Sequence, residues 1–284
     1  MYLRSGNKKG IHCKSGSDWT EDDLCYFKIK IIHITNYYDF FEEYPKVTFT
    51  NEDVKEFLTY DLSDVVAQQN INWKMIKSRF VKTVIKDLIA VTKTHRFEES
   101  AVDDLSKSIF QLFEYDDGDR TIRTREILDL DMANKKTQAI PDICIETLEL
   151  SIKLVVQEDK SYNVGNDRHL MGHHPEAQVI AEAIAAYQEN VKIYKRLGKT
   201  EIPDNQLIPA IVMLGSCPTF YLINITQELA AFVKNGEEAI NETIVKKYML
   251  PNLPINISDV MLSKNHIIHL ASCYESFKKF IFNK

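Results

Sequence analysis

The 284-residue sequence lacks the short signatures of several large enzyme classes. It has no Walker A motif for a nucleoside triphosphate, no GxGxxG for a dinucleotide and no GxSxG for a nucleophilic serine. It also has no internal repeat and no low-complexity tract. Nucleotide-dependent and serine-hydrolase functions therefore have no support from its motifs, although a soluble α/β enzyme of another class stays open.

Cysteine is scarce and dispersed, with five residues and no CxxC pair. An odd number of widely spaced cysteines favours reduced thiols over a disulfide framework, so we expect an intracellular protein of the cytoplasm or nucleus. The N-terminus has no apolar run like that of a signal peptide. No apolar run approaches the ~20 residues that a membrane helix needs, so no membrane partner is expected. The cysteines are Cys13, Cys25, Cys144, Cys217 and Cys273.

Positive charge is not in excess either, because the formal net charge is −6. This balance argues only weakly against a nucleic-acid partner, since a basic patch can be local. A helix expected over residues 72–94 places four cations on one stripe, at ~100° per residue. The stripe could follow a phosphate backbone, or it could simply solvate one side of an amphipathic helix. Its members are Arg79, Lys82, Lys86 and Lys93.

The order of expected elements predicts an α/β fold with a mixed central β-sheet flanked by helices. Residues 1–96 are expected to form an N-terminal α+β accessory region, and residues 97–284 the main domain. In the main domain a helix over 97–115 precedes three strands, and a second helix over 175–197 precedes two more. The expected strands cover 123–132, 138–147, 149–160, 207–216 and 220–226.

Two of these strands carry polar residues at one end of an apolar pair. Asp142 lies near the start of the first, and Glu158 and Lys160 lie at the end of the second. If the strands form a hairpin with its turn near residue 150, Asp142 lies opposite Glu158, ~5 Å away at Cβ. Two carboxylates at that spacing repel each other unless they share a proton or a divalent cation.

A hard oxygen site of this kind suits Mg²⁺ or Mn²⁺. Lys160, two residues after Glu158 on the same face, could position the attacking water and neutralise charge on a phosphate. These roles describe metal-assisted phosphodiester hydrolysis. A surface ion pair between Glu158 and Lys160 is the simpler alternative.

The motif Pro141-Asp142, fifteen residues, then Glu158-Asp159-Lys160 resembles the PD-(D/E)XK nuclease superfamily, which has the restriction-endonuclease-like fold. The resemblance covers about residues 97–226, and the N-terminal part is similar to fungal proteins that carry this domain. It implies a magnesium-dependent nuclease, acting on DNA more than RNA, with Asp142 and Glu158 as metal ligands. It further implies a ligand from the carbonyl of Asp159.

The same resemblance implies two further site residues. An acid from the first core helix is expected to be Glu99, with Glu98 and Asp103 as alternatives. A glutamine from the next helix, as in RecB-like exonucleases, would be Gln178. The tyrosine that this branch has one turn later is absent, since position 182 is Glu.

Other residues have weaker patterns. His169, His173 and His174 lie in the loop before the second helix, where His173 and His174 could contact phosphate, although an exposed loop without a role is the leading interpretation. Cys144 is interpreted as a packing residue, since no His is near it in sequence. A homodimer is open, and so is a nuclease-like scaffold that binds nucleic acid or protein without cutting.

Overall fold

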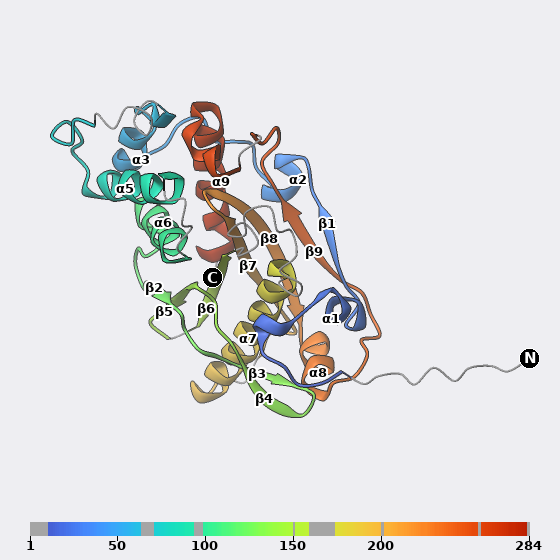
Figure 1. Cartoon of the computed structure of the whole chain (residues 1–284). Coiled ribbons are helices and arrows are strands. Elements are labelled where there is room, and N and C mark those ends of the chain that lie inside the picture. The colour runs from blue at the N-terminus through green and yellow to red at the C-terminus, as the bar shows by residue number, and fades with distance from the viewer. Residues whose placement is uncertain are drawn as a thin grey trace, which may run out of the picture.

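The computed structural model describes residues 11–63, 71–93, 99–149, 151–158, 174–199, 202–254 and 257–282. Within these ranges a mixed β-sheet runs through the molecule and helices cover both of its faces (Figure 1). The expected class, a mixed central sheet flanked by helices, is confirmed. In order across the sheet, the strands are β1 (Ile29–His33), β9 (Thr243–Tyr248), β8 (Cys217–Thr226), β7 (Asn205–Leu214), β6 (Ile152–Glu158), β5 (Ile143–Thr147) and β2 (Arg120–Thr124).

The sheet contains both parallel and antiparallel strand pairs, and their arrangement positions the predicted site. β2, β5 and β6 form an antiparallel meander, and β6 then pairs in parallel with β7. β7, β8 and β9 are antiparallel, and β1 joins the edge in parallel with β9. The start of β5 and the end of β6 therefore meet at one end of the sheet.

The strand expected over residues 123–132 is two strands, so that prediction is wrong in detail. The chain leaves the main sheet after β2 and turns at Arg125, whose φ of 54° lies in the left-handed region. It then forms a separate antiparallel hairpin of β3 (Leu128–Met132) and β4 (Lys135–Ala139). β4 ends before Pro141, which has no N–H to continue a strand ladder.

The helix expected over residues 72–94 begins later than predicted, as α5 (Arg79–Lys93). The hydroxyl of Ser78 accepts hydrogen bonds from the backbone N–H groups of Phe80 and Val81, at 3.1 and 3.2 Å. This is the geometry of an N-cap, which starts the helix at the next residue. The other helices are α1 (Glu21–Tyr26), α2 (Tyr37–Phe41), α3 (Glu52–Phe57), α6 (Glu99–Leu112), α7 (Pro175–Arg196), α8 (Gln227–Asn235) and α9 (Lys264–Phe282), with short 3₁₀ turns η1 (Gly16–Asp18) and η3 (Ile257–Leu262).

The predicted helix over 175–197 is confirmed as α7, a 22-residue helix with Pro175 in its first turn. Gly198 follows its end with a φ of 70°, which glycine adopts without strain. In the described ranges, every helix is too short or too polar to cross a bilayer.

Two apolar cores lie on the two faces of the sheet, and successive side chains along a strand point into one core and then the other. We call them the α6-side core, which includes α5, α6 and α9, and the α7-side core, which includes α1, α7, α8 and the β3–β4 hairpin. Ile143, Ile145 and Leu154 belong to the α6-side core. Cys144 and Ile152 belong to the α7-side core. This alternation assigns each position near the predicted site to one face.

The described part of residues 1–96 contributes to the same sheet and to both cores. β1 pairs with β9, residue for residue from Ile29 opposite Thr243. Trp19 and Phe27 are fully buried in the α7-side core, and Phe41 is fully buried in the α6-side core. The boundary at residue 96 stays a prediction, but this region does not have a core of its own among the described residues.

Candidate functional site

The predicted acidic residues of β5 and β6 come to the same end of the sheet. Asp142 lies in a bend directly before β5, and Glu158 is the last residue of β6. The backbone carbonyl of Asp142 accepts a hydrogen bond from the N–H of Arg125 at 3.0 Å. Because the two strands are antiparallel, their start and end are neighbours. The side chain of Glu158 lies outside the part of the chain that is described.

The expected pairing of Asp142 with Glu158 is wrong by one residue. β5 and β6 pair with Ile143 opposite Val156 and Ile145 opposite Leu154. One step beyond Ile143, this register sets Asp142 opposite position 157 and Pro141 opposite position 158. Since side chains alternate along a strand, the expected single face is lost: Asp142 is in phase with Cys144, and position 158 with Leu154.

A local irregularity in β6 causes this shift. The register slips by one residue between Ile145, opposite Leu154, and Glu146, opposite Ile152, so Lys153 has no partner in β5. Without that extra residue, Asp142 and position 158 would share a face. A β-bulge of this kind changes the face of every later residue in the strand.

Asn190 of α7 holds the backbone at the irregularity. Its buried side chain accepts from the N–H of Ile152 at 2.7 Å and donates to the C=O of Ile152 at 2.9 Å. It also donates to the side-chain oxygen of Gln206 in β7, at 3.1 Å. Because a side chain from α7 binds both backbone groups of Ile152, the helix helps to decide where β6 departs from regular pairing.

Gln178 and Glu182 lie one turn apart in the first half of α7. Both are buried, and Glu182 has no exposed surface. The amide of Gln178 donates to one carboxyl oxygen of Glu182 at 3.1 Å. Burial and, next, the negative charge of Asp142 raise the pKa of Glu182 well above its ordinary value, against the opposing effect of the Gln178 hydrogen bond. Asp142 and Glu182 are therefore close enough to interact electrostatically.

The sequence motif drew attention to position 182 only because a tyrosine was expected there, and it predicted no role for Glu182. A clearer signal was available. Glu182 is the single acid in AQVIAEAIAAY, a segment that is otherwise apolar except for Gln178. Charged residues are almost never fully buried unless they have a partner, so an acid in such a segment marks a special position.

Of the acids considered for the first core helix, the structure describes the side chain of Asp103 but not that of Glu99. Glu99 is the first residue of α6, and its side chain lies outside the described part, so its role stays a prediction. The alternative acid Asp103 lies on α6 with a carboxyl oxygen 3.7 Å from the guanidinium of Arg125. Since the N–H of Arg125 binds the carbonyl of Asp142, Asp103 reaches the same corner of the sheet.

The predicted residues Asp159, Lys160 and His173 lie outside the described residues, and so do His169 and the alternative acid Glu98. His174 is half-buried at the N-terminus of α7, and its carbonyl accepts from the N–H of Gln178 at 2.9 Å. His174 also lines a cleft of about 780 Å³ between the start of α7 and strands β7, β8, β9 and β1. The cleft gives the candidate corner an open neighbour on the α7 side of the sheet.

Two cations of the basic stripe on α5 contact aromatic rings of the protein itself. Arg79 and Lys86 are exposed, Lys82 is half-buried, and the side chain of Lys93 is not among those described. The Arg79 guanidinium lies 5.0 Å from the Phe80 ring centre, and the Lys86 amine lies 5.6 Å from that of Trp73. These contacts cover apolar surface, so a nucleic-acid role for the stripe stays a prediction.

The thiol of Cys144, which shares a face with Asp142, is buried among apolar side chains. Burial, and to a smaller extent the charge of Glu146, raise its pKa to about 12. A thiol in that state is not a nucleophile near neutral pH. This environment agrees with the interpretation of Cys144 as a packing residue.

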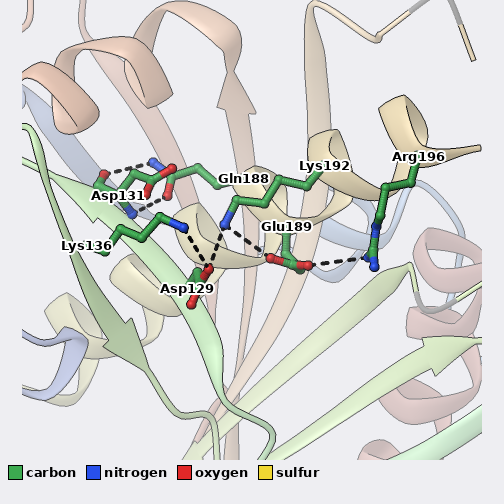
Figure 2. A network of polar contacts seen from close by, with 7 residues as sticks. All are labelled: Asp129, Asp131, Lys136, Gln188, Glu189, Lys192 and Arg196. Atoms are coloured by element: carbon green, nitrogen blue, oxygen red, sulfur yellow. Dashed lines mark hydrogen bonds and ion pairs between the residues drawn. The ribbon is translucent and has the colours of Figure 1, made fainter. Parts of the chain in front are cut away.

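A polar network fixes the C-terminal half of α7 to the β3–β4 hairpin, as Figure 2 shows. The Lys192 amine lies 3.2 Å from a carboxyl oxygen of Asp129 and 3.3 Å from one of Glu189. The Lys192 hydrogen bond is the main cause that lowers the pKa of Asp129. Gln188 exchanges two hydrogen bonds with the backbone of Asp131, at 2.8 and 3.1 Å. With this half fixed, the turn that carries Gln178 and Glu182 has one defined position on the sheet.

The oxygen donors at this corner fit a hard divalent cation such as Mg²⁺ or Mn²⁺. One carboxyl oxygen of Glu182 is buried without a hydrogen-bond partner, and the negative charge of Asp142 acts on this carboxyl group. Among the described residues no group of three His, Cys, Asp or Glu side chains is arranged to hold a metal. No protein-family model and no curated protein matches this chain, so the case for its function is made by this geometry and by the sequence motif.

Proposed function

We propose that this protein is a divalent-metal-dependent nuclease that hydrolyses phosphodiester bonds, of DNA more than of RNA. The observation that carries the proposal is the meeting of four separate segments at one corner of the sheet. Asp142 before β5, the end of β6 at Glu158, the first turns of α7 and Asp103 of α6 all belong to that corner. The order α6, β2, β5, β6, α7, β7 supports it, since it follows the order of the resembled nuclease core.

Each residue of this corner would have its own role in metal binding or in hydrolysis. Asp142 would hold Mg²⁺ or Mn²⁺. Glu158, the Asp159 carbonyl and Glu99 are the further ligands that the resemblance implies, and the side chains of Glu158 and Glu99 are not among those described. When bound, such a cation stabilises negative charge that builds up on the phosphate in the transition state. Lys160 would position the attacking water, and Gln178 would orient the carboxyl of Glu182, which it contacts at 3.1 Å.

The experiment is a cleavage assay on plasmid and single-stranded DNA and on RNA, with Mg²⁺, Mn²⁺ or EDTA. The proposal expects cutting that EDTA abolishes and that Asp142→Asn and Lys160→Ala both lose. Glu146→Gln is the matched control, because Glu146 is a buried acid of the same β5 strand whose partner is Arg123, 2.5 Å away. Absence of metal-dependent cutting by the folded wild type on all three substrates would refute the proposal.

The second candidate function is a nuclease-like scaffold that binds nucleic acid or protein without cutting. The register of β5 and β6 favours it, since Asp142 and position 158 are out of phase. The same assay separates the two candidates when it is paired with a binding measurement. Retained DNA binding without cutting, unchanged by Asp142→Asn, is the result that the scaffold predicts.

A further inference from the structure

The cleft on the α7 side of the sheet lies in register with the candidate corner. The strand pairings place four positions in one row across the sheet: Asp142, position 157, Val212 and Thr219. Val212 and Thr219 line the cleft, and Asp142 is in phase with Cys144 of the core on the same side. Neighbouring strands are ~4.8 Å apart, so the cleft begins two strands, or about 10 Å, from Asp142.

The walls of this cleft are mainly apolar. Side chains from α1, β1, β7 and the end of β9 form them, among them Leu24, Ile31, Val212, Leu214 and Met249. The cleft volume of about 780 Å³ lies within the range of ligand pockets, which is about 300–1,000 Å³. A cleft of this size and lining can take up a flat organic group.

A hydrogen-bonded ion pair lies among these apolar walls. The hydroxyl of Tyr221 donates to a carboxyl oxygen of Glu176 at 2.7 Å, and the amine of Lys247 donates to the same oxygen at 2.6 Å. All three residues line the cleft. Within the described structure, the other carboxyl oxygen of Glu176 has no hydrogen-bond partner. An ammonium group has three N–H donors, one of which binds Glu176, so a ligand would find an acceptor and a donor side by side.

The rim of the cleft is balanced in charge. The exposed amines of Lys28 and Lys30 line it together with the exposed acids Glu21 and Glu242, and Lys30 lies 3.7 Å from Glu242. A surface that binds a phosphate backbone carries an excess of positive charge. The balance therefore favours an uncharged group as the occupant. A nucleobase is such a group, since it is flat and presents hydrogen-bond donors and acceptors side by side on its edge.

We propose that the cleft binds the base of a nucleotide beside the scissile phosphate, and that the substrate is therefore unpaired, single-stranded nucleic acid. The inference rests on the proposed nuclease function and names the form of its substrate. The apolar walls would cover the faces of the base, and Glu176 and Lys247 would bind its edge. A base in a duplex must first leave its stack and its partner, which costs free energy. A duplex of the same sequence should therefore bind more weakly.

The test measures binding without cutting, by the fluorescence anisotropy of a short labelled DNA single strand in EDTA. It compares the wild type with Lys247→Met and Lys246→Met. Lys247 is opposite Tyr221 of the α7-side core, whereas Lys246 is opposite Leu222 of the α6-side core. Both variants lose one positive charge, but only Lys247→Met changes the cleft.

Lys247→Met is expected to weaken binding of the single strand about tenfold, the effect of losing a hydrogen bond from a charged group. Lys246→Met is expected to bind like the wild type. The wild type should also bind the single strand more tightly than the duplex of the same sequence. Equal affinities of the two variants, or equal affinities for single strand and duplex, would overturn the inference.

A second measurement uses only the wild type and covers the case in which the cleft variant does not fold. In methyl-labelled protein, the single strand is expected to shift the NMR signals of Ile31, Val212 and Leu214, which line the cleft. The control signals are those of Ile32 and Ile244, which alternate with Ile31 and Val245 and so lie on the other face. Larger shifts at the control signals, or no shift at the cleft, would overturn the assignment.

The outcomes separate this inference from the proposed function. If the wild type cuts nucleic acid with metal but the cleft signals do not respond to the single strand, the inference fails and the function stands. If binding of the single strand depends on Lys247 but no substrate is cut, the cleft is a nucleic-acid site and the nuclease function fails. A folded wild type that neither binds the single strand nor cuts any substrate overturns both.

Discussion

In the C-terminal half of α7, polar side chains meet partners: Gln188 binds the backbone of Asp131, Asn190 binds that of Ile152, and Lys192 binds Asp129. In the N-terminal half, Glu182 is more deeply buried than Gln188 and Lys192, yet one of its oxygens has no partner. The same helix thus contains polar side chains whose hydrogen bonds are made and, at Glu182, a carboxyl group with one oxygen that has no hydrogen-bond partner in the described structure. A buried polar group that has its hydrogen bonds can be explained by its contribution to stability. A buried polar group without a hydrogen-bond partner needs a separate explanation. The predictions below test whether the two halves of α7 really serve structure and function separately.

The largest effect is expected from Asp142→Asn at the functional end. The change keeps the shape of the side chain and removes the charge that a cation requires. The proposed nuclease activity should fall by about 10²–10³-fold, as when a group that stabilises transition-state charge is lost. Thermal unfolding should be unchanged or shifted slightly upward, because a repulsion with Glu182 is relieved. If Asp142→Asn lowers the unfolding temperature so far that unfolding alone accounts for the lost activity, Asp142 is a structural residue.

Asn190→Ala should give the largest loss of stability at the structural end. It removes the two hydrogen bonds to the backbone of Ile152, which then stays buried and unpaired. We expect the free energy of unfolding to fall by about 2–4 kcal/mol, measured by urea denaturation. Since Asn190 helps to fix the slip in β6, backbone amide shifts of residues 152–158 should change more than those of β8. Stability within 0.5 kcal/mol of the wild type would remove Asn190 from this role, since that is about the range of a neutral surface change.

Gln188→Ala should have a smaller effect of the same kind. Gln188 exchanges two hydrogen bonds with the backbone of Asp131 (Figure 2), but β3 belongs to a two-stranded sheet that is separate from the main sheet. The free energy of unfolding should fall by about 1–2 kcal/mol. The nuclease activity and the Mn²⁺ affinity should match those of the wild type. If either drops tenfold, the two halves of α7 are not independent.

The smallest effect is expected from the pH dependence of Asp129. Lys192 lowers the pKa of Asp129 in the folded state, so the ion pair adds stability above the ordinary pKa of an aspartate and loses it as pH falls through the lower, folded-state value. Asp129→Asn should flatten the acid limb of the stability–pH curve in that window and leave neutral and basic pH nearly unaffected. Because the pair is partly exposed, the change should be below about 1 kcal/mol. High salt should diminish it further, whereas a salt-independent difference would contradict an ionic origin.

Much of the fold could be predicted from residue patterns that act over short distances. The apolar period and the Pro175 and Gly198 signals define α7 to within a residue of its observed end. The apolar runs of β7 and β8 and the class of the sheet were predicted for the same reason. The errors occur where a local conformation interrupts a pattern, as at Ser78, which delays α5, and at Arg125, which splits an expected strand.

The sequence by itself determined that Asp142 and Glu158 lie at one end of two neighbouring strands, because strand length and a short turn bring those positions together. Which face each belongs to was decided only by the tertiary structure. A single unpaired residue, Lys153, reverses the phase of β6, and the side chain that holds this conformation, Asn190, comes from a helix 37 residues further along the chain. Alternation along a strand has a period of two, so one extra residue is enough to exchange the faces, and no pattern within the strand encodes it. Glu182, on which the charge of Asp142 acts, belongs to α7, so its place near Asp142 depends on how that helix packs on the sheet.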